Sequence, residues 1–146
     1  MLDYLRAFKM VVVGNRAFSM SAIAMIGCEL DGWTLKTNTG QVYKLNTEET
    51  QIFKRECQQG LILAPSSDPL AFLRQALNWI VLHNRAINLQ AIMAVGETPD
   101  FKDHMTVHLF GGWEVILTPI ESQMFKRECQ NLIFEAQKLA TRLQPR

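Results

Sequence analysis

The chain has 146 residues, of which 48% are hydrophobic and 20% are charged, an ordinary composition for one globular domain. Its 15 lysines and arginines nearly balance its 14 aspartates and glutamates, which gives a net charge of +1. Bulk charge therefore does not indicate nucleic acid, a membrane surface or an acidic partner. The longest apolar runs are too short to span a bilayer.

Three cysteines, Cys28, Cys57 and Cys129, are odd in number and widely spaced. This spacing argues against a disulfide framework and favours a reducing compartment. The N-terminal residues lack the long apolar core and the small-residue cleavage site of a secretory signal. We therefore expect a cytoplasmic protein without membrane contact. No cysteine or histidine cluster has the spacing of metal ligands, and we expect neither a metal nor a cofactor.

The first part of the chain is rich in strand signals and ends in a helix signal. The predicted strands are, in order, Lys9–Val13, 18–26, Trp33–Thr37 and Gln41–Leu45. The last two are joined by a turn at 38–40 and read as a hairpin. Asn46 then stands three residues before Glu49, a capping-box pattern that predicts a helix ending near Gly60.

The second part repeats this order after the turn-rich segment 64–69, which we interpret as a linker. The spacing of apolar residues favours a helix over Pro69–Asn78. The predicted strands that follow are Trp79–Leu82, 87–95, His104–Phe110 and Trp113–Leu117. Thr118 and Glu121 form a second capping-box pattern, and the helix that it starts is predicted to run on until residue 144 with one buried apolar stripe.

The sequence contains one unit written twice. Glu49–Gln58 returns as Glu121–Gln130 with eight of ten positions identical, and Asn15–Gly27 is echoed at Asn84–Gly96. An internal repeat outweighs other sequence signals for the fold. We predict an α+β fold of two tandem repeats, each with three to four antiparallel strands followed by a helix, related by a pseudo-twofold axis. Repeat 1 (about 1–63), the linker 64–69 and repeat 2 (about 70–146) are expected to form a single domain.

The repeat retains a Lys-Arg-Glu triplet in each copy, at 54–56 and 126–128. One interpretation is a pair of basic sites that contact phosphates. The alternatives are a solvated helix face, or a reciprocal salt bridge where the two helices meet. Other cations flank strands whose outward positions are polar. The candidate nucleic-acid or partner-binding residues are Lys54, Arg55, Lys126, Arg127, Arg16, Arg85 and Lys36. The polar outward positions are Ser19, Ser21, Thr34, Lys36, Asn88, Gln90, His104, Thr106 and His108.

No catalytic residue is predicted. Cys57 and Cys129 lie on the apolar stripe of their helices and are expected to be structural. His104 and His108 share a strand face and could hold a metal only if a third ligand came from elsewhere. Gly-rich phosphate loops, nucleophile elbows and zinc signatures do not occur in the sequence. We therefore expect a non-enzymatic protein.

A strand-rich unit closed by a helix and repeated about a pseudo-twofold axis resembles the family of single-stranded nucleic-acid-binding regulators. That family includes the plant Whirly proteins, the PC4-type coactivators and the Pur-alpha repeats. The segment Gly112–Glu121, with its helix, also looks like small cyanobacterial proteins of that fold. The resemblance implies binding of single-stranded DNA or RNA in a regulatory role. The alternative is a protein–protein adaptor or small assembly factor that binds no nucleic acid, and an oligomer is left open.

Overall fold

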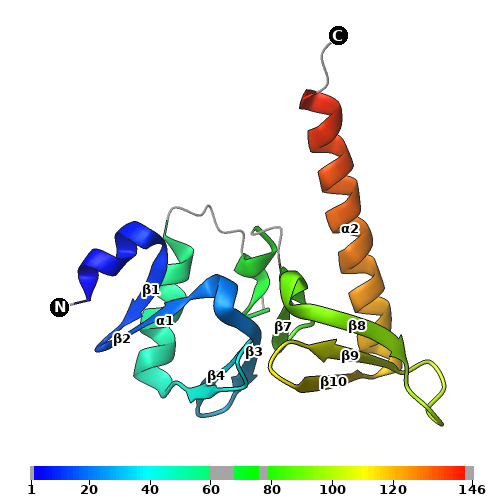
Figure 1. The fold of residues 1–146 in the computed structure, drawn as a ribbon, viewed down its shortest axis with the longest axis horizontal. Helices are drawn as coiled ribbons and strands as arrows, with labels where there is room; N and C mark the ends of the chain where they lie inside the picture. Colours follow the sequence, from blue (N-terminus) through cyan, green and yellow to red (C-terminus); the bar gives the residue numbers. More distant parts are fainter. Residues whose placement is uncertain (1, 60–67, 76–78, 144–146) are drawn as a thin grey trace.

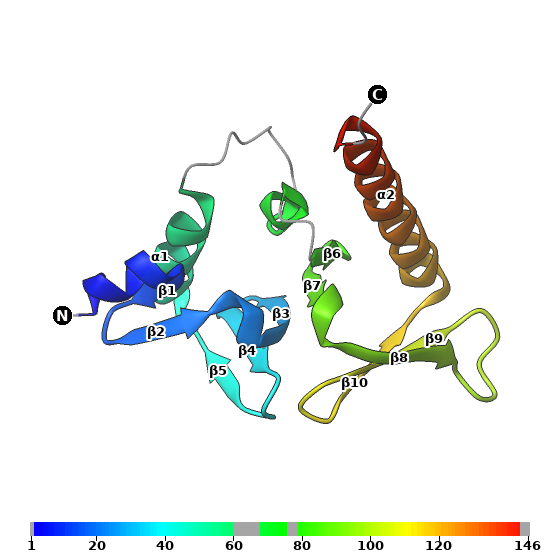
Figure 2. The ribbon, with the colours of Figure 1, turned by 45° about the horizontal axis from the view of Figure 1, so that its top comes forward.

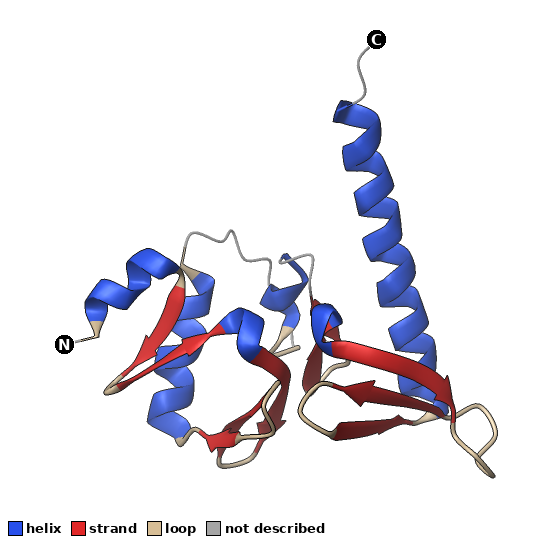
Figure 3. Cartoon of the chain, in the orientation of Figure 1, coloured by secondary structure: helices blue, strands red, loops and turns tan. Residues whose placement is uncertain are grey.

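The computed structural model describes residues 2–59, 68–75 and 79–143 (Figure 1). Within this part of the chain the fold is α+β, as predicted, with ten strands, two α-helices and four short 3₁₀ helices. Figure 3 shows the shorter α-helix lying against the strands on one side of the molecule and the longer α-helix rising from the strands on the other side, extending well beyond the sheets.

The described residues fall into a first half, 2–59, and a second half, 68–143. The first half contains η1 (Asp3–Phe8), β1 (Met10–Val13), β2 (Arg16–Ser19), η2 (Met20–Ala22), β3 (Ile23–Glu29), β4 (Gly32–Thr37), β5 (Val42–Lys44) and α1 (Thr47–Gln58). The second half contains η3 (Ala71–Gln75), β6 (Trp79–Val81), β7 (Arg85–Asn88), η4 (Leu89–Ala91), β8 (Ile92–Glu97), β9 (Met105–Leu109), β10 (Trp113–Leu117) and α2 (Pro119–Leu143). The two halves thus present their elements in the same order.

The strands form three antiparallel sheets. Their strand orders are β1-β2, β5-β4-β3-β7-β6 and β10-β9-β8. The central sheet joins the halves, because β3 pairs with β7 with Met25 opposite Ile87 and Gly27 opposite Arg85. This joint uses strands that occupy different places in the two halves. It therefore does not by itself establish the pseudo-twofold axis, which stays a prediction.

Both hydrophobic cores draw on both halves. Phe53 lies fully buried in the first core, in edge contact with Phe18 and Trp33 at centroid distances of 6.2 Å. Trp79 of the second half closes the same core. The second core is built around β7, β9, β10 and Phe125, and also contains residues of β3. Each buried aromatic or aliphatic side chain contributes about 1.5–3 kcal/mol, so the halves stabilise one another.

Both helix starts are confirmed as capping boxes. The Asn46 side chain accepts from the Glu49 N–H at 2.8 Å, and the Glu49 carboxylate accepts from the Asn46 N–H at 3.1 Å. Thr118 and Glu121 make the same reciprocal pair at 3.2 Å in each direction. These bonds satisfy backbone donors that a helix N-terminus leaves without partners.

Several predicted boundaries are wrong. The continuous strands expected at 18–26 and 87–95 are each interrupted by a 3₁₀ turn, η2 or η4, which turns the chain into a second strand. In place of the helix expected over Pro69–Asn78, the described residues contain only η3 and then β6. The expected helix end near Gly60 and residues 64–67 of the expected linker lie outside the described residues.

The predicted apolar stripe of α2 is only partly buried. Phe125 is buried and Leu132 is half-buried, but Ile133 and Leu139 are exposed. Figures 1 and 2 show why: the C-terminal part of α2 projects away from the sheets, so none of the described strands packs against it. Helical periodicity predicts which residues share a face and does not reveal whether that face has a partner.

Candidate nucleic-acid interface

Arg16 and Arg85 lie at the start of β2 and β7 and are held by the capping glutamate of their own half. Arg16 reaches Glu49 at 2.5 Å. Arg85 makes a forked contact with Glu121, at 2.8 and 3.1 Å, and also donates to the Ile116 carbonyl at 3.2 Å. All of these charged side chains are only partly exposed. Both arginines therefore tie a strand to a helix start, and part of their charge is already compensated.

Lys36 of β4 lies close to the point where the turns after β4 and β9 contact each other. Its ammonium lies 5.1 Å from the centre of the Trp113 ring, a cation–π contact, and the indole N–H of Trp113 donates to the Thr37 carbonyl at 2.7 Å. The turns after β4 and β9 touch closely, since a Cβ on Gly111, whose φ is +93°, would lie 2.5 Å from the Thr37 oxygen. Only glycine fits there, because any larger residue would separate the two turns.

In each of the two Lys-Arg-Glu triplets, the glutamate makes an ion pair with another element of the fold. Glu56 pairs with Arg6 of η1 at 2.6 Å, and Glu128 pairs with Arg74 of η3 at 2.6 Å. The salt bridges therefore run to the 3₁₀ helices, and the described residues contain none between the triplets of α1 and α2.

The lysines and arginines of the triplets take no part in these salt bridges. Arg55, Lys126 and Arg127 are exposed and Lys54 is half-buried. Among the described residues, none of these four makes a hydrogen bond or ion pair. They are therefore the candidate cations with the most freedom to meet an external phosphate.

The Lys-Arg pair on α1 and the Lys-Arg pair on α2 are separated in the fold. Figures 1 and 2 show α1 and α2 apart, with the segment containing η3 between them. The two pairs are therefore two separate candidate sites.

The polar sheet face predicted from strand alternation is partly wrong. Three of its members are buried and satisfied inside the fold. Asn88 donates to the Ile23 carbonyl at 3.0 Å, Thr106 bonds Thr98 at 2.8 Å, and Thr34 donates to Glu29 at 3.0 Å. Alternation along a strand predicts which residues share a face, but the neighbouring layer decides whether that face meets water.

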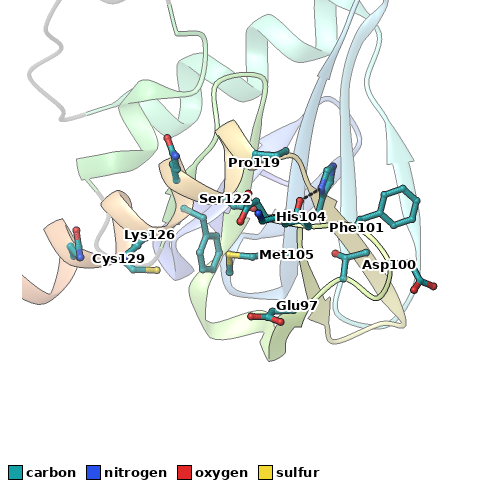
Figure 4. Close-up of a pocket in the computed structure, with 15 residues that line it drawn as sticks. Glu97, Asp100, Phe101, His104, Met105, Pro119, Ser122, Lys126 and Cys129 are labelled. Carbon is teal, nitrogen blue, oxygen red and sulfur yellow. Dashed lines mark hydrogen bonds between the residues drawn. The ribbon is translucent and has the colours of Figure 1, made fainter.

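Sequence reasoning missed an open pocket of about 1190 Å³ between the β8–β9 loop and α2 (Figure 4). Met105 and Phe125 form apolar walls, while Glu97 and Lys126 bring opposite charges to it. The pocket joins residues far apart in the chain, so no local pattern could have revealed it.

The Cys57 and Cys129 thiols are both partly buried. Burial raises the pKa of Cys57 to about 12 and also raises the pKa of Cys129, which keeps both thiols protonated. The His104 ring is engaged with the Lys102 carbonyl at 3.0 Å in the turn before β9. Within the described residues, no three histidine, cysteine or acidic side chains are placed to share a metal ion.

Arg6 and Arg74 were also missed, although the sequence carries a signal for them. The segment Leu-Asp-Tyr-Leu-Arg at 2–6 matches Leu-Ala-Phe-Leu-Arg at 70–74. The two arginines make equivalent ion pairs with α1 and α2. A search for repeated segments that extended to the chain start would have found both.

Comparison with known proteins supports the fold. No family model and no curated protein sequence matches the chain. Among solved structures, a LytTr DNA-binding domain from Bacillus cereus superposes with a TM-score of 0.54 at 10% sequence identity. The match covers 82% of this chain and 94% of that domain. The fold is thus similar to that of a DNA-binding domain, of another kind than the Whirly-type proteins suggested by the sequence.

Across residues 2–59, 68–75 and 79–143, no helix combines the length and the apolar character that a bilayer crossing requires.

Proposed function

We propose that this protein is a non-enzymatic, regulatory nucleic-acid-binding protein that contacts the phosphate backbone through lysine and arginine pairs on its two α-helices. The observation that supports the proposal most strongly is the likeness of its fold, over 82% of the chain, to a LytTr DNA-binding domain. Fold likeness alone raises the expectation of a function without assigning it, so the site residues carry the rest of the argument.

The contact residues follow from the charges that the fold leaves available. Lys54 and Arg55 on α1, with Lys126 and Arg127 on α2, have no ion-pair partner among the described residues. Lysine and arginine side chains of this kind bind phosphates by charge, with little dependence on base sequence. We therefore assign the phosphate contacts to these four residues.

The remaining candidates receive a supporting role. Arg16 and Arg85 are held by carboxylates, and Lys36 lies over an indole ring. Their side chains would have to leave these partners to bind a phosphate directly. They contribute positive potential near the strands, and their substitution is expected to affect folding more than binding.

The test is fluorescence anisotropy with labelled single-stranded DNA, single-stranded RNA and duplex DNA, at salt concentrations from low to physiological. We expect a Kd in the micromolar range or tighter at low salt, with affinity that falls steeply as salt rises. The single-stranded form is expected to bind best on the sequence resemblance, and preference for the duplex would favour the LytTr likeness instead. No binding of any of the three at low salt would contradict the proposal.

The matched control removes two charges from elsewhere on α2. The double variant Lys126→Gln with Arg127→Gln should weaken binding and flatten its salt dependence. The double variant Lys138→Gln with Arg142→Gln changes the net charge equally and should bind nearly as the natural chain does. Equal losses in both variants would show that net charge, and not the proposed site, governs binding.

One observation favours a second candidate function, a protein–protein adaptor. The projecting part of α2 exposes three large apolar side chains, Ile133, Phe134 and Leu139, and exposed apolar surface of this size is typical of sites that bind a partner. An adaptor would be indifferent to oligonucleotides, so the same anisotropy experiment separates the two functions.

A further inference from the structure

The joint between the halves has two sides. The first half supplies a receiving surface, formed by β3 and Trp33, and the second half supplies an inserting surface, formed by β7 and Phe72 of η3. On the receiving side, β3 pairs with β7, and the Cys28 N–H extends the ladder by donating to the Asn84 carbonyl at 2.8 Å. On the inserting side, Phe72 of η3 stacks on Trp33 with ring centroids 6.3 Å apart. Strand pairing and an inserted aromatic ring thus hold the second half on the first.

The second half carries the corresponding receiving strand, and its edge is open. β8 follows η4 as β3 follows η2, and it pairs with β9 as β3 pairs with β4. Its other edge has no strand partner among the described residues. Met93 is 61% exposed and Val95 is 43% exposed, whereas Ala24 and Ile26, 69 positions earlier, are fully buried. An apolar strand with an open edge is a ready template for another strand.

The pocket of Figure 4 lies beside that strand, where the aromatic ring would insert. In the first half, Trp33 and Phe53 are buried and Phe72 stacks on the indole. The residues 72 positions later are Met105 and Phe125, and they line the open pocket of about 1190 Å³. In the second half, Met105 and Phe125 thus line a pocket, but no described aromatic ring stacks there as Phe72 stacks on Trp33 in the first half.

The first half carries the counterpart of the inserting surface, formed by β2 and η1. β2 occupies the place of β7, and among the described residues it pairs only with β1. η1 carries the same Leu-x-aromatic-Leu-Arg segment as η3, and its arginine makes the same type of ion pair with the adjoining helix. Yet Tyr4 is 65% exposed, while its counterpart Phe72 is 6% exposed.

We infer that a second copy of this chain docks its β2 edge and η1 onto the β8 edge and the pocket of the first copy. The β3–β7 register, shifted by 69 positions, gives the antiparallel pairs Ala94 with Phe18, Val95 with Ala17 and Gly96 with Arg16. Tyr4 of the docking copy enters the pocket beside Met105.

One chain cannot make this contact with itself, because β2 and β8 lie on opposite sides of the β3–β7 joint in Figures 1 and 2. The contact is head-to-tail, so copies close into a ring or continue as a chain.

The experiment is sedimentation velocity of the full chain over a range of concentrations, without nucleic acid. We expect the natural chain to associate as concentration rises. Val95→Asp places a charge on the receiving edge, Tyr4→Asp places one on the inserting helix, and each variant alone should be monomeric. Mixed one to one, they should form a dimer that grows no further, because each supplies the surface that the other lacks.

Two controls keep the outcome clear. Phe134→Asp changes an equally exposed apolar residue on α2 and should leave association unchanged. If circular dichroism shows that Val95→Asp is unfolded, Met93→Lys replaces it. A natural chain that stays monomeric at all concentrations would overturn the proposal, as would association that survives both variants or a mixture that stays monomeric. Because oligonucleotides are left out, this result is independent of the proposed nucleic-acid binding.

Discussion

The two halves of the chain show how one segment of sequence acquires different surroundings. In the first half, Ile26 of β3 is fully buried in the first core, which contains residues of β7 and η3 from the second half. In the second half, Val95 occupies the corresponding place on β8 and is exposed, and no described strand pairs with that edge. The order of the elements is the same in both halves, but the burial differs. Burial at these positions is therefore a property of the neighbour and not of the strand.

The largest expected difference between the halves concerns their buried phenylalanines. Phe53→Ala should cost about 3–5 kcal/mol, because it removes a fully buried ring that contacts two other aromatics. Phe125→Ala should cost roughly 2 kcal/mol, since one side of this ring faces the open pocket. Urea unfolding measures both, with Phe134→Ala as the exposed control. Equal costs for the two buried rings would break the comparison.

The arginines of β2 and β7 should differ in the same experiment, by a smaller amount. Arg85→Met removes a forked ion pair with Glu121 and a bond to a backbone carbonyl, which we expect to cost about 1 kcal/mol. Arg16→Met removes a single bond to a carboxylate and should cost roughly half as much, because partly exposed ion pairs contribute little. If Arg16→Met lowered the free energy of unfolding more than Arg85→Met does, the stronger of the two strand–helix contacts would lie in the first half, contrary to this expectation.

The pH dependence of stability should expose the capping box of α1. The Asn46 N–H, and then Arg16, hold the pKa of Glu49 below its usual range. A carboxyl whose folded pKa is depressed stabilises the fold above its unfolded pKa, and this contribution disappears as pH falls through the folded value.

Glu49→Gln should therefore cost a few tenths of a kcal/mol near pH 7, a small effect because the group is partly exposed and solvent screens its ion pair. The difference from the natural chain should close between about pH 5 and pH 3. Unfolding midpoints measured across this range give the result. A difference that persists at pH 3 would mean that the missing charge is not the cause.

Thiol labelling should distinguish the halves without changing stability. Burial raises the pKa of Cys57 to about 12 and raises that of Cys129 as well, but Cys129 lines the open pocket. At a concentration where the chain is monomeric, a thiol reagent at pH 8 should modify Cys129 before Cys57. Peptide mass spectrometry follows each site. Faster modification of Cys57 would mean that the pocket is less accessible than the structure indicates.

Local chemistry made part of the fold predictable. Asn46 with Glu49 and Thr118 with Glu121 fix both helix starts, because capping needs only residues three apart. The hairpins were predictable for the same reason, since their strands are neighbours in sequence. The 3₁₀ turns η2 and η4 were missed because each sits within an unbroken alternation of apolar residues, and alternation carries no sign of a turn.

The site was less predictable than the fold because it depends on contacts between distant segments. The repeat pointed to Lys54 and Lys126, but not to the ion pairs that Glu56 and Glu128 make with the 3₁₀ helices. Likewise the exposure of Val95 and the open pocket depend on which segment packs alongside. Periodicity along one chain cannot report such packing.

The salt dependence of nucleic-acid binding tests the central functional claim most directly. The variant in which Lys54, Arg55, Lys126 and Arg127 are all changed to glutamine is compared with the natural chain by plotting log K against log salt concentration. If all four residues bind phosphates, the slope should become shallower by about 3, because each neutralised phosphate accounts for roughly 0.7–0.9 of it. An unchanged slope in a folded variant would contradict the assignment of the phosphate contacts to these helices.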